Sequence, residues 1–147
     1  MLKETIALEM LRQKIGDAEF TAGDRSDYID YGRPNASELK AAQETIARKM
    51  SEAAELKKEL HMLIEQTPKD ALEEWVNWHK NVLQEILREE STDTNGKTRI
   101  FTARNTLTEW DKVLTREQDY VGINWYYLKD YKEKAEKQFK GSWLKFW

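Results

Sequence analysis

The chain contains two histidines, His61 and His79, which are the first residues to test for chemistry. His61 precedes Glu65 by one helical turn, so the two could bind a metal, but two ligands do not complete a site. Di-iron carboxylate bundles need Glu-x-x-His pairs that project inward. Lys58 and Val76 instead stand three residues before the two histidines. The sequence therefore predicts no metal site, and we expect both histidines to be solvated or at the edge of the core.

Nucleophilic chemistry has no support in the sequence. The chain has no cysteine, no Gly-x-Ser-x-Gly motif and no glycine-rich phosphate loop. We therefore predict no catalytic residue and no cofactor. An enzyme that uses His61 or His79 with nearby carboxylates is a third hypothesis, behind the two binding functions described below.

The unusual feature is a run of aromatic residues near the C-terminus. Nine aromatic residues lie between Tyr120 and Trp147, with lysines interleaved. Aromatic side chains dominate the energetics of protein interfaces, so these residues are a candidate protein-binding surface; burial in the core is the alternative interpretation. Acidic residues in the same stretch argue against membrane-surface and single-stranded nucleic-acid binding. The predicted partner-binding residues are Trp125, Tyr127, Tyr131, Phe139, Trp143, Phe146 and Trp147.

The elements that must position these residues are predicted to be mostly α-helical. Asn35 and Glu38 form a capping-box pattern at the start of a helix over 35–66. Leucine, isoleucine and alanine recur at seven-residue intervals along it, which is typical of a coiled coil. Thr67-Pro68 is expected to cap and restart a second helix that ends near residue 91. The short connection predicts a long antiparallel helical hairpin over 35–91.

The N-terminal third is predicted to be a helix over 2–15, capped by Gly16, followed by a small β-hairpin near residues 19–31. Gly23-Asp24 supplies turn chemistry, and Tyr28, Ile29 and Tyr31 favour strands. Pro34 then separates this part from the long hairpin. A single domain over 1–147 would thus consist of residues 1–34, residues 35–91 and residues 92–147.

Residues 92–147 are predicted to contain a turn, a loop and an aromatic-rich C-terminal helix. The turn covers 92–97, a brief extended segment covers 99–102, and Thr106 with Glu109 matches a second capping box. Helical spacing of apolar residues continues beyond Gly122, which we expect to interrupt or kink the helix.

Composition limits the classes of partner. The 147 residues carry a net charge of −3, and 35% of them are charged. This balance provides no general footprint for nucleic acid. No segment has the length and apolarity of a membrane span, and residues 1–5 lack the apolar core of a signal peptide. We expect a cytoplasmic protein, or a virion protein if the chain comes from a phage.

The order of elements in residues 2–50 resembles a known family. Residues 6–16 form a helix ending in glycine, Phe20 and Gly23-Asp24-Arg25 suggest a hairpin turn, and Ser37-Glu38-Leu39 open the next helix. This order resembles the lambda W-type head-completion proteins of tailed phages, which lie between portal and tail. The resemblance implies a ring-forming structural protein that binds neighbouring assembly components. No site residues transfer from it.

Two functions follow as hypotheses. The first is a non-enzymatic structural or assembly protein, for example a phage head–tail connector component, that forms homo-oligomers through its long helices and docks on partner proteins. The alternative is a small regulatory binder, such as an inhibitor, an immunity protein or an antitoxin, that captures one protein partner.

Overall fold

Five α-helices make up the computed structural model, which describes residues 1–144, with the backbone alone for 142–144. They are α1 (Lys3–Tyr31), α2 (Ala36–Gln66), α3 (Lys69–Leu87), α4 (Thr94–Leu114) and α5 (Lys129–Leu144). The described residues contain no strand. The prediction of a mostly α-helical protein is therefore confirmed, and the prediction of a β-hairpin near 19–31 is wrong.

Helix α1 continues through Gly16, the predicted cap of the first helix, and through Gly23 of the predicted hairpin. Gly16 and Gly23 have no positive φ angle, so neither ends the helix. Ile15, Ala18 and Ala22 are buried at steps of three and four, which is the helical period. Their packing outweighs the weak strand propensity of the tyrosines that follow.

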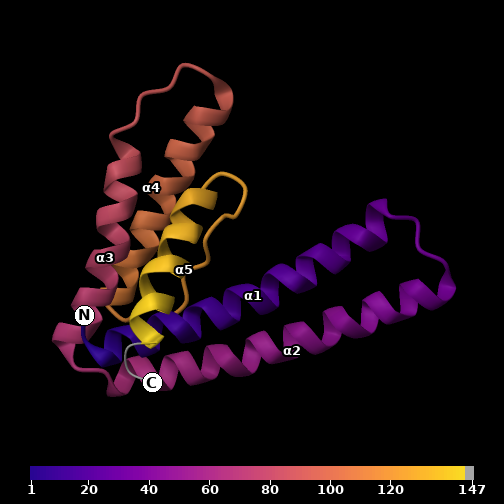
Figure 1. The fold of residues 1–147 in the computed structure, drawn as a ribbon, viewed down its shortest axis with the longest axis horizontal. Coiled ribbons are helices and arrows are strands. Elements are labelled where there is room, and N and C mark those ends of the chain that lie inside the picture. Colours follow the sequence, from indigo (N-terminus) through magenta and orange to yellow (C-terminus); the bar gives the residue numbers. More distant parts are fainter. Residues whose placement is uncertain (145–147) are drawn as a thin grey trace.

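Helix α2 begins as the sequence predicted. The Asn35 side chain accepts a hydrogen bond from the Glu38 backbone N–H at 2.8 Å, and the Asn35 backbone N–H donates to the Glu38 carboxylate at 3.2 Å. Helices α1 and α2 then run side by side in opposite directions (Figure 1). Ala42 and Ala53 are buried on α2, so small side chains permit the close approach of the two helices. The heptad-like stripe of α2 thus packs on α1 in part, with Ala42, Ala53 and Leu60 buried and Met50 52% exposed.

Helices α3 and α4 form a second antiparallel pair, which rises from one end of the first (Figure 1). The predicted antiparallel hairpin over 35–91 is therefore wrong: α2 packs on α1 and α3 packs on α4, because each finds its apolar partner face there and not across the short connection. Pro68, rather than Thr67, is the N-cap of α3, and the Thr67 hydroxyl donates back to the Leu63 carbonyl at 2.6 Å. Asp93 caps α4 by accepting a hydrogen bond from the Gly96 backbone N–H at 2.6 Å.

Helix α4 replaces three elements that the sequence predicted over 92–109. It already includes residues 94–97 of the predicted turn and residues 99–102 of the predicted extended segment. Thr106 is not a cap: its hydroxyl donates to the Thr102 carbonyl inside the helix at 2.8 Å. The helix ends at Leu114, and an irregular segment over 115–128 leads to α5.

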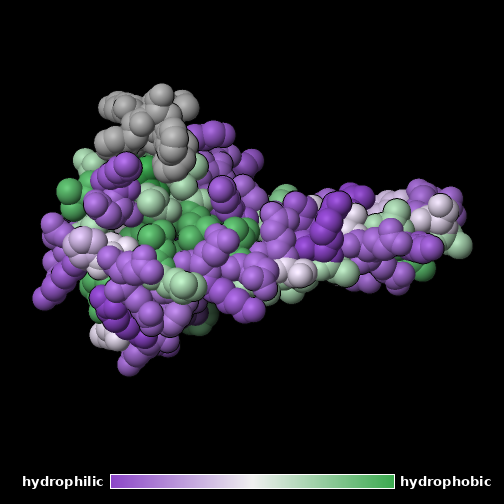
Figure 2. Space-filling model, turned by 90° about the horizontal axis from the view of Figure 1, so that it is seen from below, coloured by the Kyte–Doolittle hydropathy of each residue, from purple (hydrophilic) through white to green (hydrophobic). Residues whose placement is uncertain are grey.

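The first helical pair extends beyond the body of the molecule (Figure 1). In residues 24–50, which we call the arm, Ala42 alone is buried. Figure 2 shows that the arm surface is predominantly hydrophilic, while apolar residues gather on the body. None of the helices in the described part of the chain is both long and apolar enough to cross a membrane.

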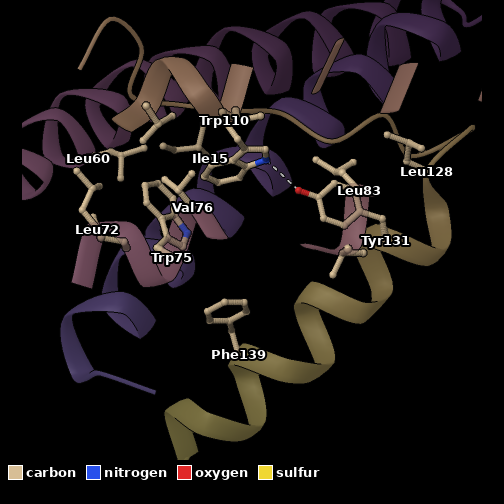
Figure 3. Close-up of a cluster of buried hydrophobic side chains, with 14 of the residues drawn as sticks. Ile15, Leu60, Leu72, Trp75, Val76, Leu83, Trp110, Leu128, Tyr131 and Phe139 are labelled. Atoms are coloured by element: carbon tan, nitrogen blue, oxygen red, sulfur yellow. Dashed lines mark hydrogen bonds between the residues drawn. The ribbon is translucent and has the colours of Figure 1, made fainter. Parts of the chain in front are cut away.

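The core lies where α3, α4 and α5 meet the start of α1 and the end of α2. Figure 3 shows Trp75 of α3, Trp110 of α4 and Phe139 of α5 directed into one cluster, with Ile15 and Leu60 nearby. The rings of Trp75 and Trp110 meet edge to face at 4.9 Å between centroids, an arrangement that aromatic pairs favour.

Candidate functional site

A buried polar cluster lies inside this aromatic core and is centred on Glu9 of α1. Its carboxylate accepts two hydrogen bonds from Arg12, at 2.8 and 2.7 Å, and one from the Trp75 indole N–H at 3.0 Å. His79 Nε2 lies 2.7 Å from the same carboxylate, and Gln13 donates to it at 2.8 Å. Five donor groups therefore surround one buried anion.

The charges of this cluster stabilise one another. Burial alone would raise the pKa of Glu9, but Arg12 and His79 outweigh burial and hold that pKa far below its ordinary range. Burial would likewise lower the pKa of Arg12, and Glu9 overcomes this effect and raises it. Glu9 and Arg12 are consequently an ion pair inside the core.

His79 is a neutral member of the cluster. Burial lowers its pKa, and Glu9 offsets this effect only in part. Because ionised Glu9 can only accept, His79 carries its proton on Nε2, and Nδ1 accepts from the Tyr131 hydroxyl at 2.7 Å. Trp110 in turn donates to that hydroxyl at 3.0 Å (Figure 3).

This cluster has no free position for a substrate. His79 is 0% exposed and lies within the core, not at its edge as we expected. Its ring stacks on Trp110 at 4.1 Å between centroids. Among the described residues, no buried side-chain nitrogen or oxygen lacks a hydrogen-bond partner. The cluster is thus a closed structural network.

His61 lies on the surface with two carboxylates. Asp119 contacts its Nδ1 at 2.7 Å and Glu65 contacts its Nε2 at 3.0 Å. The hydrogen bond with Asp119, followed by the charges of Asp119 and Glu65, raises the pKa of His61. Because the carboxylates occupy different ring nitrogens, they cannot share a metal with the imidazole. Elsewhere in the described chain, no group of three or more potential ligands can hold a metal ion either.

The structure divides the seven predicted partner-binding residues into three groups. Tyr131 and Phe139 are 1% and 0% exposed, so they belong to the core and are not available to a partner. Trp125 is 53% exposed, and Tyr127 is half-buried against the core. The side chains of Trp143, Phe146 and Trp147 lie outside the described residues.

Trp125 lines a groove that the sequence did not reveal. The groove lies between α1, the segment 120–125 and α5, with a cavity volume of about 570 Å³. Phe20 of α1, 46% exposed, meets Trp125 edge to face at 5.8 Å between ring centroids. We call it the α1–α5 groove. Two partly exposed aromatic side chains from distant parts of the chain thus form one surface.

Buried and capping contacts hold the wall of this groove in place. Arg12 donates to the Val121 carbonyl at 3.3 Å and so fixes the segment to α1. The Asn124 side chain accepts hydrogen bonds from the backbone N–H groups of Tyr126 and Tyr127, at 3.0 and 2.9 Å. This local turn, which asparagine favours, fixes the backbone on both sides of Trp125.

The groove is acidic on its α1 side. Asp17, Asp24 and Asp27 of α1 line it together with Glu19. Glu19 pairs with Lys57 at 2.9 Å, and Asp24 pairs with Arg25 at 3.1 Å. The sequence offered a signal for this face, since Gln13, Gly16, Asp17, Phe20, Gly23, Asp24 and Asp27 recur at helical spacing. The predicted β-hairpin concealed that signal.

Comparisons of the chain with protein-family models, with curated proteins and with solved structures give no match.

Proposed function

We propose that this chain is a non-enzymatic protein-binding protein that docks on its partner through the α1–α5 groove. The observation that carries the proposal is the Phe20–Trp125 pair, which lies partly exposed in a cavity of about 570 Å³. Phenylalanine and tryptophan that remain accessible at a concave site are typical of interface anchors.

The positions of the chemistry-bearing residues support a binding role over catalysis. His79 and Glu9 lie in a closed network, and the carboxylates beside His61 are already bound to its two ring nitrogens. A general base must reach a substrate proton within hydrogen-bond distance, and His79 is enclosed by aromatic rings. The groove instead combines apolar rings with unused polar groups.

Two versions of this role remain as proposals. An assembly component, such as a phage head–tail connector protein, would use the arm as a spacer, because residues 36–50 of α2 extend about 22 Å along it at 1.5 Å per residue. A regulatory binder, such as an inhibitor, an immunity protein or an antitoxin, would need only the groove. The structure weakens one motive for homo-oligomers, since the α2 stripe packs in part on α1.

Site-specific photo-crosslinking tests the proposal. Benzoylphenylalanine replaces Phe20 or Trp125 in cells that naturally produce the protein, and replaces Met62 or Phe101 as exposed controls away from the groove. We expect a discrete protein adduct from the two groove positions that the controls do not give. Groove positions that react no differently from the controls would refute the proposal.

The mass of the complex separates the two versions. A one-to-one complex with a monomeric chain favours the regulatory binder, and a ring or higher oligomer favours the assembly component. Sedimentation of the purified chain alone supplies the reference state.

A further inference from the structure

We propose that the occupant of the α1–α5 groove is a basic segment of a partner protein, whose backbone passes over Gly23. Its lysine or arginine side chains reach the Phe20–Trp125 pair and the carboxylates of Asp17 and Asp27. This inference rests on the proposed protein-binding function and names the chemistry of the partner.

Gly23 is the first reason. It lies inside α1 with a helical backbone, so no left-handed φ angle requires glycine. A Cβ atom built there has nothing within 4 Å, so no close contact inside the chain requires glycine either. Glycine destabilises a helix interior relative to alanine. A helix that keeps this residue in the lining of a groove leaves room there for the backbone of a ligand.

The unpaired charges are the second reason. Five carboxylates line the groove, from Asp17, Glu19, Asp24, Asp27 and Glu136, against the two cations Arg12 and Lys132. Arg12 is committed to Glu9, and Lys132 pairs with Glu136. Asp17 and Asp27 form no ion pair among the described residues and flank Phe20 and Gly23 on the same face of α1. The negative charge of this face is therefore only partly compensated within the chain.

The aromatic pair adds a contact that favours cations. A guanidinium or ammonium group over a tryptophan or phenylalanine face is attracted to the ring, more strongly where water is partly excluded. The chain itself uses this contact nearby, where Arg25 lies over Tyr28 at 4.9 Å and Lys57 over Tyr120 at 5.1 Å. An arginine from a partner would find both a ring and a carboxylate at Trp125.

The surroundings of the groove limit where the partner's cations lie. A second pocket between α1 and α5 shares Asp17 and Phe20 with the groove and is lined by Lys14, Lys137 and Lys140 as well. The basic residues of the partner therefore lie on the Gly23–Asp27 side of Phe20, away from these three lysines. Residues 10–27 of α1 cover about 25 Å, which corresponds to a helical segment of about sixteen residues.

A second copy of the chain fits this face poorly. A symmetric contact of groove with groove would bring together two surfaces that are each lined by five carboxylates and two cations, and surfaces of like net charge repel each other. The same negative face repels the phosphates of nucleic acid and of anionic lipid. A basic segment of another protein is the occupant that complements it.

Two synthetic peptides test the proposal by fluorescence anisotropy. One is a labelled amphipathic peptide of about sixteen residues with arginines clustered in one half, and the other has glutamate in place of each arginine. We expect the basic peptide to bind the intact chain and the acidic peptide to bind at least roughly tenfold more weakly. Binding should weaken as salt is raised to about 0.3 M.

Variants assign the binding to the groove. The double variant D17N/D27N should bind the basic peptide roughly tenfold more weakly, and its affinity should depend less on salt. G23A should raise the thermal midpoint, because alanine favours the helix, and should weaken binding by roughly tenfold, because its methyl group occupies the path of the peptide backbone. S51A, on the exposed surface of α2 outside the groove, should raise the midpoint without changing binding.

Opposite effects of G23A on stability and on binding would support the inference. Equal affinity for the two peptides, or G23A binding as tightly as the parent chain, would overturn it. A dimer that W125A dissociates would identify a second copy as the occupant and overturn it as well. If crosslinking at Phe20 gives a protein adduct but the purified chain shows no preference for the basic peptide, the inferred chemistry of the partner is refuted and the proposed function is left intact.

Discussion

Replacing Glu9 with glutamine should strongly destabilise the fold. The substitution keeps the shape of the side chain and removes its charge, so it isolates the electrostatic role of the carboxylate. Glutamine offers one acceptor oxygen in place of two, while the donors from Arg12, Trp75, His79 and Gln13 stay in place. At least one donor group loses its partner, and the Arg12 guanidinium becomes a buried cation without an anion.

The expected loss is about 3–5 kcal/mol, because removal of one partner leaves the other charge uncompensated in the interior. Domains of this size are stable by about 5–15 kcal/mol, so about a fifth or more of the free energy of unfolding would disappear. With a urea dependence of about 2 kcal/mol per molar, the midpoint should fall by about 2 M.

Acid should narrow the difference between E9Q and the parent chain. The pKa of Glu9 in the folded chain lies below its ordinary value of 4.5. Its contribution to stability is therefore fully present above about pH 4.5 and is lost as the pH falls toward the folded value. The gap between the two urea midpoints should accordingly shrink below that pH.

Urea unfolding followed by tryptophan fluorescence measures these effects. E55Q is the matched control, since Glu55 forms an exposed ion pair with Lys58 at 3.3 Å, and exposed pairs contribute little. R12M combined with E9Q should be less destabilised than the two single changes predict together. A loss below about 1 kcal/mol for E9Q with an unchanged urea dependence would refute the account of a buried ion pair.

Three further predictions address the histidines and the aromatic residues. In NMR titrations, His79 should carry its proton on Nε2 and stay neutral at and somewhat below the ordinary histidine pKa of 6.5, while His61 should titrate above that pKa. The H61A variant assigns the two signals. Protonation of His79 at pH 6.5 would contradict the closed network. Y131F should cost about 1–3 kcal/mol in urea unfolding, because the Trp110 donor and the His79 acceptor lose their partner. F139A should cost about 3–5 kcal/mol and W125A less than about 1 kcal/mol; equal losses would mean that Trp125 is a core residue.

Local signals identified the α2–α3 part of the fold from the sequence. Asn35 and Glu38 act on each other within one helical turn. Pro68 restricts its own backbone and that of its neighbour. Such short-range effects operate before any tertiary contact forms, so the sequence predicted the start of α2 and the break near 67–68. They do not fix the direction in which α3 leaves that break, and the predicted antiparallel packing of α3 on α2 is wrong, because α2 packs on α1 and α3 packs on α4.

The error at residues 19–31 has a long-range cause. Gly23 and the tyrosines favour a turn and strands locally, but these preferences are weak. Ala18 and Ala22 are buried on α1, and α1 packs along α2, which begins after both of them in the chain. Helix packing outweighed the local propensity. Because α1 is one continuous helix, Asp17, Phe20 and Gly23 lie on the same face.

The sequence by itself determined that the chain is mostly helical, that a helix begins after Asn35 and breaks near 67–68, and that its C-terminal part is rich in aromatic residues. Only the tertiary structure decided which aromatic residues are core and which are surface, since Tyr126 and Tyr131 are the same residue type and are 63% and 1% exposed. It also converted Glu9 and Arg12, an ordinary i, i+3 pair on a helix, into a buried cluster with Trp75 and His79. Burial depends on contacts between residues far apart in the chain, and helical spacing fixes only which residues share a face.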